Sequence, residues 1–222
     1  MQSIKTNREV AEVVRTDMFE KSNTYYIIKR IMDIVGSIVG MIVFSPVILI
    51  VAIAIKLDSK GPVIYSHIRV GKNGKPFKMY KFRSMVVDAD ALKSKLKEKN
   101  EMSGPMFKIK DDPRITKVGK FIRRTSLDEL PQFYNILRGE MSIVGPRANL
   151  PDEVEQFTAF QKQKLLAKPG LTCYWQVMGR NNIDFEEWME LDVKYLKERS
   201  IWLDIILILK TFKVFLGDEN AM

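Results

Sequence analysis

The sequence predicts a helix-rich α+β fold in a single membrane-associated domain. Three observations predict this fold. The run from Ile34 to Ile55 is apolar and uncharged, and it meets the ~20-residue length that a helix needs to cross a bilayer. A pattern of alternating apolar residues surrounds Asn73-Gly74, which indicates a small β-hairpin. The second half of the chain carries apolar residues at the spacing of amphipathic helices.

Composition limits both the domain and its partners. A length of 222 residues suits one domain with a hydrophobic core. The formal net charge of +9 favours an anionic partner, which leaves a phosphorylated ligand, nucleic acid or an acidic lipid surface open. Cys173 and His67 are the only residues of their types, which excludes a disulfide framework and a multi-histidine metal site within one chain. Any metal is therefore expected to have oxygen ligands.

The apolar run has a helix breaker at its middle, Ser45-Pro46, where proline removes a backbone hydrogen bond and clashes with the preceding turn. Lysine or arginine flanks both ends of the run, so the positive-inside rule gives no direction. Two arrangements remain open: a kinked spanning helix, or a re-entrant helix that returns to the same face, with Ser45 bonding a carbonyl that the proline frees. A buried core helix fits the length less well.

The hairpin predicted from Val63 to Phe82 is followed by helical segments. Most basic residues of the hairpin are expected to form a solvated face, but Lys81 and Arg83 close its second strand and are candidates for phosphate binding. Further elements are predicted at 88–100, 116–124, 152–166 and 185–198 as helices, at 171–177 as a strand, and at 201–216 as a very apolar helix. That last helix is expected to lie in a membrane interface or to pack on the core.

A basic stretch that encloses two acids is the strongest candidate site. Arg123 and Arg124 precede Asp128-Glu129, and Arg147 follows in a Gly-Pro-Arg turn. Arginine forks fit phosphate oxygens. A carboxylate held ionised by these charges and by a helix start can attack phosphorus or hold magnesium. The alternative is a capping box from Ser126 to Glu129, but Pro131 would then fall in the second helical turn, where its missing N–H matters.

Five ordered motifs resemble the monotopic phosphoglycosyl transferases of the bacterial sugar transferase family. The resemblance covers about 26–217, and its motifs are the segments 80–85 (YKFRSM), 112–116 (DPRIT), 124–132 (RTSLDELPQ), 141–147 (MSIVGPR) and 168–172 (KPGLT). The set in this order is specific, whereas any one motif alone is weak.

The resemblance implies transfer of a sugar 1-phosphate from a UDP-sugar to polyprenyl (undecaprenyl) phosphate, with release of UMP, at the start of surface glycan synthesis. It implies that Asp128 is the nucleophile that forms a covalent phosphosugar intermediate, that Glu129 is its partner, and that both acids hold Mg²⁺. It places the helix break at Ser45 and Pro46 and so favours the re-entrant form, on the cytoplasmic face of the bacterial plasma membrane. The expected substrate phosphate-binding residues are Lys81, Arg83, Arg123, Arg124, Arg147 and Arg180.

The expected organisation is an N-terminal extension over 1–24, a re-entrant membrane hairpin over 25–60, and a cytoplasmic catalytic domain with a C-terminal interfacial helix over 61–222. The expected partners are the two substrates and membrane lipid, with a homodimer as an option and no nucleic acid. One residue departs from the family pattern: Ala148 stands where a second proline often follows Gly-Pro-Arg, which puts the rigidity of that turn in doubt.

A competing hypothesis is a membrane-tethered basic module that binds anionic lipid or nucleic acid, motivated by the charge of +9. The chain lacks the interleaved aromatic and basic strands of RNA-binding sheets, which lowers this hypothesis. The sequence does not distinguish which sugar is transferred.

Overall fold

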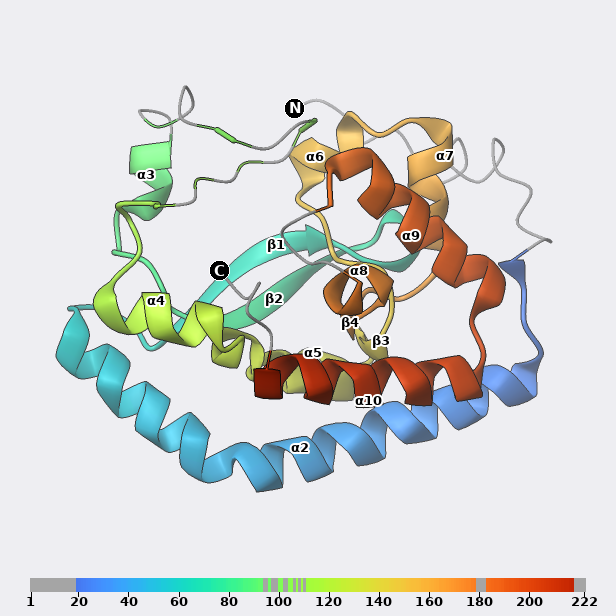
Figure 1. The fold of residues 1–222 in the computed structure, drawn as a ribbon, viewed down its shortest axis with the longest axis horizontal. Helices are drawn as coiled ribbons and strands as arrows, with labels where there is room; N and C mark the ends of the chain where they lie inside the picture. Colours follow the sequence, from blue (N-terminus) through green and yellow to red (C-terminus); the bar gives the residue numbers. More distant parts are fainter. Residues whose placement is uncertain are drawn as a thin grey trace.

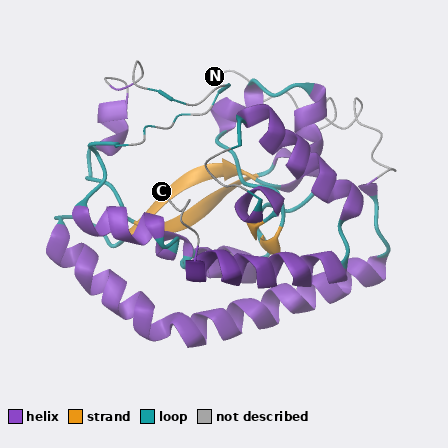
Figure 2. Ribbon diagram, in the orientation of Figure 1, coloured by secondary structure: helices purple, strands orange, loops and turns teal. Residues whose placement is uncertain are grey.

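The computed structural model describes residues 19–93, 96, 100, 101, 104, 105, 107, 109, 111–178 and 183–217. Figure 1 shows one long helix, α2, running along the base of the molecule, with the rest of the chain folded above it. Helices dominate and the strands form two small sheets (Figure 2). The predicted helix-rich α+β class is therefore confirmed.

Helix α2 spans Asn23–Asp58, and Ser22 caps its start by accepting a hydrogen bond from the backbone N–H of Tyr25. The helix contains Pro46 and bends near its middle (Figure 1). Proline at this position leaves the carbonyl of Ile42 without its helical N–H donor. The hydroxyl of Ser45 donates to that carbonyl at 2.8 Å, so the predicted repair of the helix break by Ser45 is confirmed.

Both halves of α2 contact the folded domain above it. Near its start, the guanidinium of Arg30 donates to the carbonyls of Ile136 and Leu137 at 2.6 Å each. At its end, the carboxylate of Asp58 accepts from the backbone N–H of Val118 at 3.1 Å. Between these points the inner face joins the main core cluster. The outer face is apolar and exposed along its length, at residues 27, 28, 31, 35, 38, 39, 42, 43, 49, 50, 53 and 57.

Strands β1 (Ile64–Val70) and β2 (Pro76–Phe82) form the predicted antiparallel hairpin. The connection, η2 (Lys72–Gly74), places Asn73 at φ 57° and Gly74 at φ 74°. These are the left-handed conformations that an Asn-Gly turn requires, so the local sequence rule holds here. The register opposes Tyr65 to Lys81, and this pairing aims Lys81 toward the same face as the odd-numbered residues of β1.

A second, parallel pair joins β3 (Ser142–Val144) to β4 (Gly170–Thr172). The remaining helices are α3 (Ala89–Lys93), α4 (Lys117–Arg124), η4 (Leu127–Glu129), α5 (Gln132–Arg138), α6 (Pro151–Glu155), α7 (Ala159–Lys162), η5 (Gln163–Leu166), α8 (Tyr174–Val177), α9 (Phe185–Glu198) and α10 (Ile201–Gly217). The helices predicted at 116–124, 185–198 and 201–216 are confirmed within two residues.

Two predicted elements are wrong in detail. The single helix predicted over 152–166 is broken into α6, α7 and η5, because Thr158 caps a new helix by accepting from the backbone N–H of Gln161. The strand predicted over 171–177 ends at Thr172, and α8 follows it.

Helix α10 lies beside α2 (Figure 1). One of its faces packs on the core, where Asp204 and Leu207 are buried, and its other face exposes Trp202, Leu209 and Phe212. The helix therefore packs on the core, which is one of the two alternatives left open by its sequence, and its placement in a membrane interface stays a prediction.

Candidate active site

The two acids lie on a short turn and not at the start of a long helix. Asp128 and Glu129 belong to η4, and Pro131 immediately precedes α5. Ser126, before η4, adopts a left-handed conformation with φ 52° and makes no side-chain capping bond. The capping-box alternative is therefore wrong. Pro131 stands where its missing N–H disrupts no helical hydrogen bond.

Lys81 reaches both acids from strand β2. Its ammonium lies 2.6 Å from Oε1 of Glu129 and 3.6 Å from Oδ2 of Asp128. All three side chains are less than a fifth exposed, so the surrounding solvent screens the interaction only weakly. The sequence analysis expected Lys81 to bind substrate phosphate and did not predict its contact with the acid pair, which lies 47 and 48 residues away in the chain.

A buried asparagine fixes Lys81 relative to the acids. Asn135 on α5 is completely buried and accepts from the backbone N–H of Tyr80 at 3.0 Å. Its amide nitrogen donates to the carbonyl of Lys78 and to Glu140, at 2.7 Å each. These bonds attach the part of β2 that immediately precedes Lys81 to α5. Because η4 lies just before α5 in the chain, they also hold Lys81 close to the two acids. The sequence analysis did not identify Asn135, because its partners are known only once β2 and α5 meet.

Burial raises the pKa of the Asp128 carboxyl above its ordinary value, and the neighbouring charge of Glu129 raises it further. The positive charges of Lys81, Arg123 and Arg147 act in the opposite direction, Lys81 most strongly. The expectation that charge and helix dipole hold this pKa low is therefore wrong in direction. The reason is desolvation, which disfavours a charged carboxylate inside the protein.

The Gly-Pro-Arg turn is held by close backbone contact with the segment around Gly170. The N–H of Gly170 donates to the carbonyl of Pro146, and the N–H of Gly145 donates to the carbonyl of Thr172, at 2.9 Å each. A Cβ on Gly170 would overlap the backbone nitrogen of Gly145. Ala148 is buried, and its carbonyl accepts from Arg69 at 3.2 Å. These contacts fix the turn, so the absence of the second proline does not leave it loose.

Arg147 extends from this turn over two aromatic rings. Its guanidinium lies 5.1 Å from the ring centroid of Trp175 and 5.5 Å from that of Trp188, within range of cation–π attraction. Arg147, Lys81 and Glu129 line one cleft beside Asp128. The buried amide nitrogen of Gln132, which lines the same cleft, has no hydrogen-bond partner among the described residues.

The other predicted phosphate-binding residues have different positions. Arg123 and Arg124 are exposed at the end of α4, and Arg123 acts on Asp128 through its charge. Arg83 is buried and donates to the carbonyls of three residues that follow α2, at 2.6–2.9 Å, namely Ser59, Lys60 and Pro62. Its observed contacts fix the chain between α2 and β1, and its expected binding of substrate phosphate stays a prediction. Arg180 lies outside the described residues.

Two residues near the site were left as structural or solvated by the sequence analysis. The Nε of Arg69 donates to Nε2 of His67 at 2.6 Å. Burial, together with the charges of Arg69, Lys81 and Arg147, lowers the pKa of His67 to about 3, so this histidine is neutral at ordinary pH. Burial and Arg147 also lower the pKa of Arg69 to about 10. The alternation of side chains along the strand could have placed His67 and Arg69 near Lys81, because residues 65, 67 and 69 share the hairpin face that carries Lys81.

The residues present fit magnesium as the expected metal. Asp128 and Glu129 are two adjacent carboxylates, and no group of three or more metal-ligating side chains occurs among the residues that the structure describes. Mg²⁺ commonly binds through one or two carboxylates and takes its other ligands from substrate phosphates and water. An acid pair beside a cleft lined by Lys81 and Arg147 meets that requirement.

The model of the family described as bacterial sugar transferase matches residues 24–218. The chain belongs to the bacterial sugar transferase family. Among the relatives of this sugar transferase, the galactosyl transferase CpsE of Streptococcus agalactiae is 53% identical over 89% of the chain and 44% of its own length. The undecaprenyl-phosphate galactose phosphotransferase of Salmonella typhimurium is 42% identical over 94% of the chain and 44% of its own length.

A third relative is the UDP-glucose:undecaprenyl-phosphate glucose-1-phosphate transferase of Klebsiella pneumoniae, which is 42% identical over 86% of the chain and 41% of its own length. The chain therefore spans less than half the length of each of these three relatives.

Proposed function

We propose that this sugar transferase moves a sugar 1-phosphate from a UDP-sugar to polyprenyl phosphate and releases UMP. The observation that carries the proposal is the cleft in which Lys81 and Arg147 face the acid pair Asp128-Glu129. Two relatives whose names state a transfer of sugar phosphate to undecaprenyl phosphate support the reaction class.

The chemistry assigned to Asp128 is nucleophilic. One of its carboxylate oxygens attacks the sugar-bearing phosphorus of the UDP-sugar, and the bond from that phosphorus to the bridging oxygen breaks, so UMP leaves with the electron pair. A phosphate oxygen of polyprenyl phosphate then attacks the same phosphorus. The bond to Asp128 breaks, which regenerates the carboxylate and yields polyprenyl-diphospho-sugar. A covalent intermediate divides the transfer into two displacements.

The cationic side chains neutralise the charge that gathers in both displacements. Lys81 favours the ionised form of the buried Asp128 carboxyl, because its charge lowers the pKa against the larger effect of burial, and it offsets the repulsion between this carboxylate and the diphosphate. The guanidinium of Arg147, held by its turn and by two tryptophans, presents forked donors to phosphate oxygens. Mg²⁺, held by Asp128 and Glu129, would supply further neutralisation of the diphosphate when bound.

The proposed setting is a membrane surface, with α2 inserted from one side as a re-entrant helix. Two observations support it. Residues near both ends of α2 make polar contacts with the same domain, namely Lys29, Arg30 and Asp58, which suits a helix whose ends lie on one side of the bilayer. The exposed face of α2 is apolar from Ile27 to Leu57, and water would disfavour so large an apolar surface. The proposed side is the cytoplasmic face, where nucleotide sugars are available.

Release of UMP from purified enzyme, mixed with Mg²⁺, polyprenyl phosphate and a panel of UDP-sugars, tests the reaction. Donor labelled in the sugar phosphate should label the wild-type protein covalently and should not label Asp128→Asn. Because asparagine removes the cost of a buried charge, Asp128→Asn should also melt at a higher temperature than wild type near pH 7, which would show that its loss of activity is not misfolding.

Undiminished turnover by Asp128→Asn would refute the covalent mechanism. Failure of every UDP-sugar to release UMP, together with salt-sensitive binding to anionic lipid, would favour the basic binding module instead.

A further inference from the structure

A second cavity, of about 270 Å³, is lined in part by Val144 of β3 and shares no lining residue with the cleft beside Asp128. Five cationic side chains and one carboxylate, Asp33, line it. The cations come from four separate parts of the chain, and they are Lys29, Arg30, Lys72, Lys168 and Arg199. Such an excess of one charge around a cavity favours an anionic ligand.

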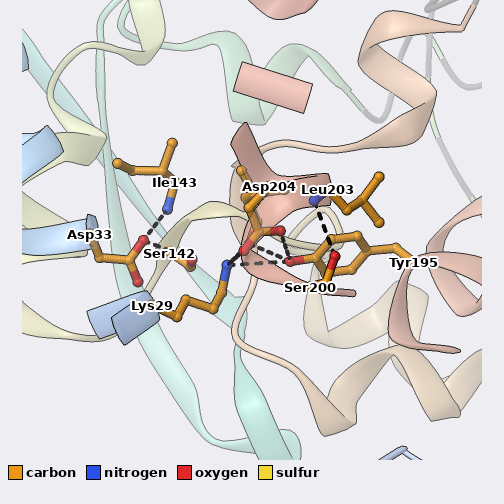
Figure 3. A network of polar contacts seen from close by, with 9 residues as sticks. Lys29, Asp33, Ser142, Ile143, Tyr195, Ser200, Leu203 and Asp204 are labelled. Carbon is orange, nitrogen blue, oxygen red and sulfur yellow. Dashed lines mark hydrogen bonds and ion pairs between the residues drawn. The ribbon is translucent and has the colours of Figure 1, made fainter. Parts of the chain in front are cut away.

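Three of the five cations, and Asp33, are already engaged with protein groups. Lys29 forms an ion pair with Asp204 at 2.6 Å (Figure 3). Arg30 and Arg199 donate to backbone carbonyls. Asp33 accepts hydrogen bonds from the hydroxyl of Ser142 and the backbone N–H of Ile143, at 2.9 Å each (Figure 3). The charge of Asp33 offsets part of the positive charge around Lys168, but one carboxylate does not balance the five cations that line the cavity.

Lys72 and Lys168 are the two cations that remain available to a ligand. The ammonium of Lys72 lies over the ring of Tyr26, at 5.3 Å from its centroid. No hydrogen-bond acceptor is recorded for the ammonium of Lys168 among the described residues. Burial and then the positive charge of Arg30 lower the pKa of Lys168, and Lys72 and Lys29 add to this effect, while the charge of Asp33 partly opposes it. Like charges gathered in a half-buried cavity repel one another, and an anion between them would relieve that repulsion.

The surroundings of the cavity specify the kind of anion. Exposed apolar residues of α2 stand next to its cationic residues in the chain, namely Ile27, Ile28 and Ile31, and Trp202 follows Arg199 closely. A volume of about 270 Å³ falls just below the roughly 300–1,000 Å³ of sites that hold drug-sized ligands, which suits a phosphorylated head group better than a whole nucleotide sugar. Cations that line the cavity, with exposed apolar residues beside them in the chain, match a molecule with a phosphate head and apolar chains.

We propose that this cavity binds the phosphate head group of an anionic amphiphile, with Lys72 and Lys168 as its principal donors, at a site separate from the one where sugar phosphate is transferred. The assignment to an amphiphile rests on the membrane setting proposed above. A free phosphate ion has the same head-group chemistry, and the experiment separates the two sources.

The test is the thermal midpoint of the purified protein in a neutral detergent with three additives: dihexanoyl phosphatidic acid, dihexanoyl phosphatidylcholine and inorganic phosphate. A ligand that binds only the folded state raises the midpoint. Phosphatidic acid should raise it, phosphatidylcholine should leave it nearly unchanged, and inorganic phosphate should act only at much higher concentration. A full shift with inorganic phosphate alone would overturn the assignment to an amphiphile.

Lys168→Gln and the double variant Lys72→Gln/Lys168→Gln locate the effect. Each should weaken the apparent affinity for phosphatidic acid by about tenfold or more, as expected when a charge-assisted bond is lost. Their midpoints without ligand should not fall, because removing a lysine lowers the repulsion in the cavity. Lys75→Gln is the matched control, since Lys75 lies in the same hairpin turn but is exposed and outside the cavity. If phosphatidic acid raised the thermal midpoint of the double variant as much as that of Lys75→Gln, the proposed site would be refuted.

The outcome is separable from that of the proposed reaction. Asp128→Asn should keep the full shift with phosphatidic acid, because the cavity does not include Asp128. A wild-type protein that releases UMP but shows no shift with phosphatidic acid would disprove this site alone. A protein that shows the lysine-dependent shift but releases no UMP would disprove the reaction alone.

Discussion

At the scale of single residues, the environment of Asp128 combines two opposing effects. Its carboxyl is nine-tenths buried, and burial raises its pKa, while Lys81, Arg123 and Arg147 lower it. Desolvation is the larger effect. The carboxylate is consequently more basic than an exposed aspartate and carries fewer water molecules, and both properties favour attack on phosphorus.

The pH dependence of turnover should reveal this balance. Below its raised pKa, Asp128 is protonated and cannot attack, so kcat/KM should fall with decreasing pH at a value above the ordinary aspartate pKa of about 3.9. Lys81→Gln removes the largest influence that lowers the pKa of Asp128, so the acidic limb of the kcat/KM profile should move to higher pH. Lys81→Arg keeps the positive charge and should return the limb to its wild-type position.

The comparison for this prediction is Lys78→Gln on the same strand, because Lys78 is exposed and points to the opposite hairpin face. Its acidic limb should coincide with that of wild type. A limb that stays in place in Lys81→Gln would show that Lys81 does not control the ionisation of Asp128, whatever its effect on substrate affinity.

The residue scale also shows what the sequence alone can predict about a site. Asp128, Glu129, Lys81 and Arg147 were all identified from motifs and local charge, and the structure brings them to one cleft. The position of Arg83 close to Lys81 in the sequence did not reveal that Arg83 donates to carbonyls just after α2. Whether a charged side chain is buried against backbone carbonyls depends on how distant segments pack together, which local sequence does not reveal.

At the scale of elements, local rules succeeded where the determining contacts are close in sequence. The hairpin followed from Asn73-Gly74, and the repair of the Pro46 break by Ser45 followed from spacing within one helical turn. The helix predicted over 152–166 failed, although the capping residues Thr158 and Gln161 were visible in the sequence. Apolar periodicity was given more weight there than the local capping pattern.

The attachment of β2 to α5 offers a test at this scale. Asn135→Ala would leave the N–H of Tyr80 and the carbonyl of Lys78 unpaired inside the protein, and each such group costs about 1–3 kcal/mol. We expect a loss of about 2–4 kcal/mol of stability by thermal or chemical denaturation. We also expect a lower kcat, because Lys81 loses its fixed position beside the acids.

The control for Asn135→Ala is Lys78→Ala, which removes an exposed side chain from the same strand and keeps its carbonyl. This variant should stay within about 0.5 kcal/mol of wild type, as surface substitutions usually do. Equal stability of the two variants would mean that the Asn135 hydrogen bonds do not hold the strand.

At the scale of the whole molecule, α2 acts as a common base for the fold. Its inner face supplies side chains to the core, and it bonds the segments before β3 and around α4. The sequence indicated an apolar helix with a break, but it did not indicate that Asp33 would be buried against Ser142 and Ile143. Charged residues next to an apolar run resemble ordinary flanks until the partner segment is known.

The contacts at both ends of α2 lead to a topology prediction. Glu20 and Lys60 are exposed on either side of the helix. The native Cys173 is completely buried, so it should not react with the label, and labelling should come only from cysteines placed at 20 and 60. A membrane-impermeant maleimide should label Glu20→Cys and Lys60→Cys in inside-out vesicles and neither in right-side-out vesicles. Leu49→Cys, on the exposed apolar face, should stay unlabelled in both, because lipid covers it.

A kinked spanning helix makes a different prediction, since one of the two end positions would react only in right-side-out vesicles. That pattern in the wild-type background would disprove the re-entrant placement. Pro46→Leu supplies the reference for it: leucine restores an N–H donor to the carbonyl of Ile42 and favours a straight helix. The variant should therefore move one end across the bilayer. Its polar contacts at Lys29 or at Asp58 would then have to break, so the variant should also lose thermal stability.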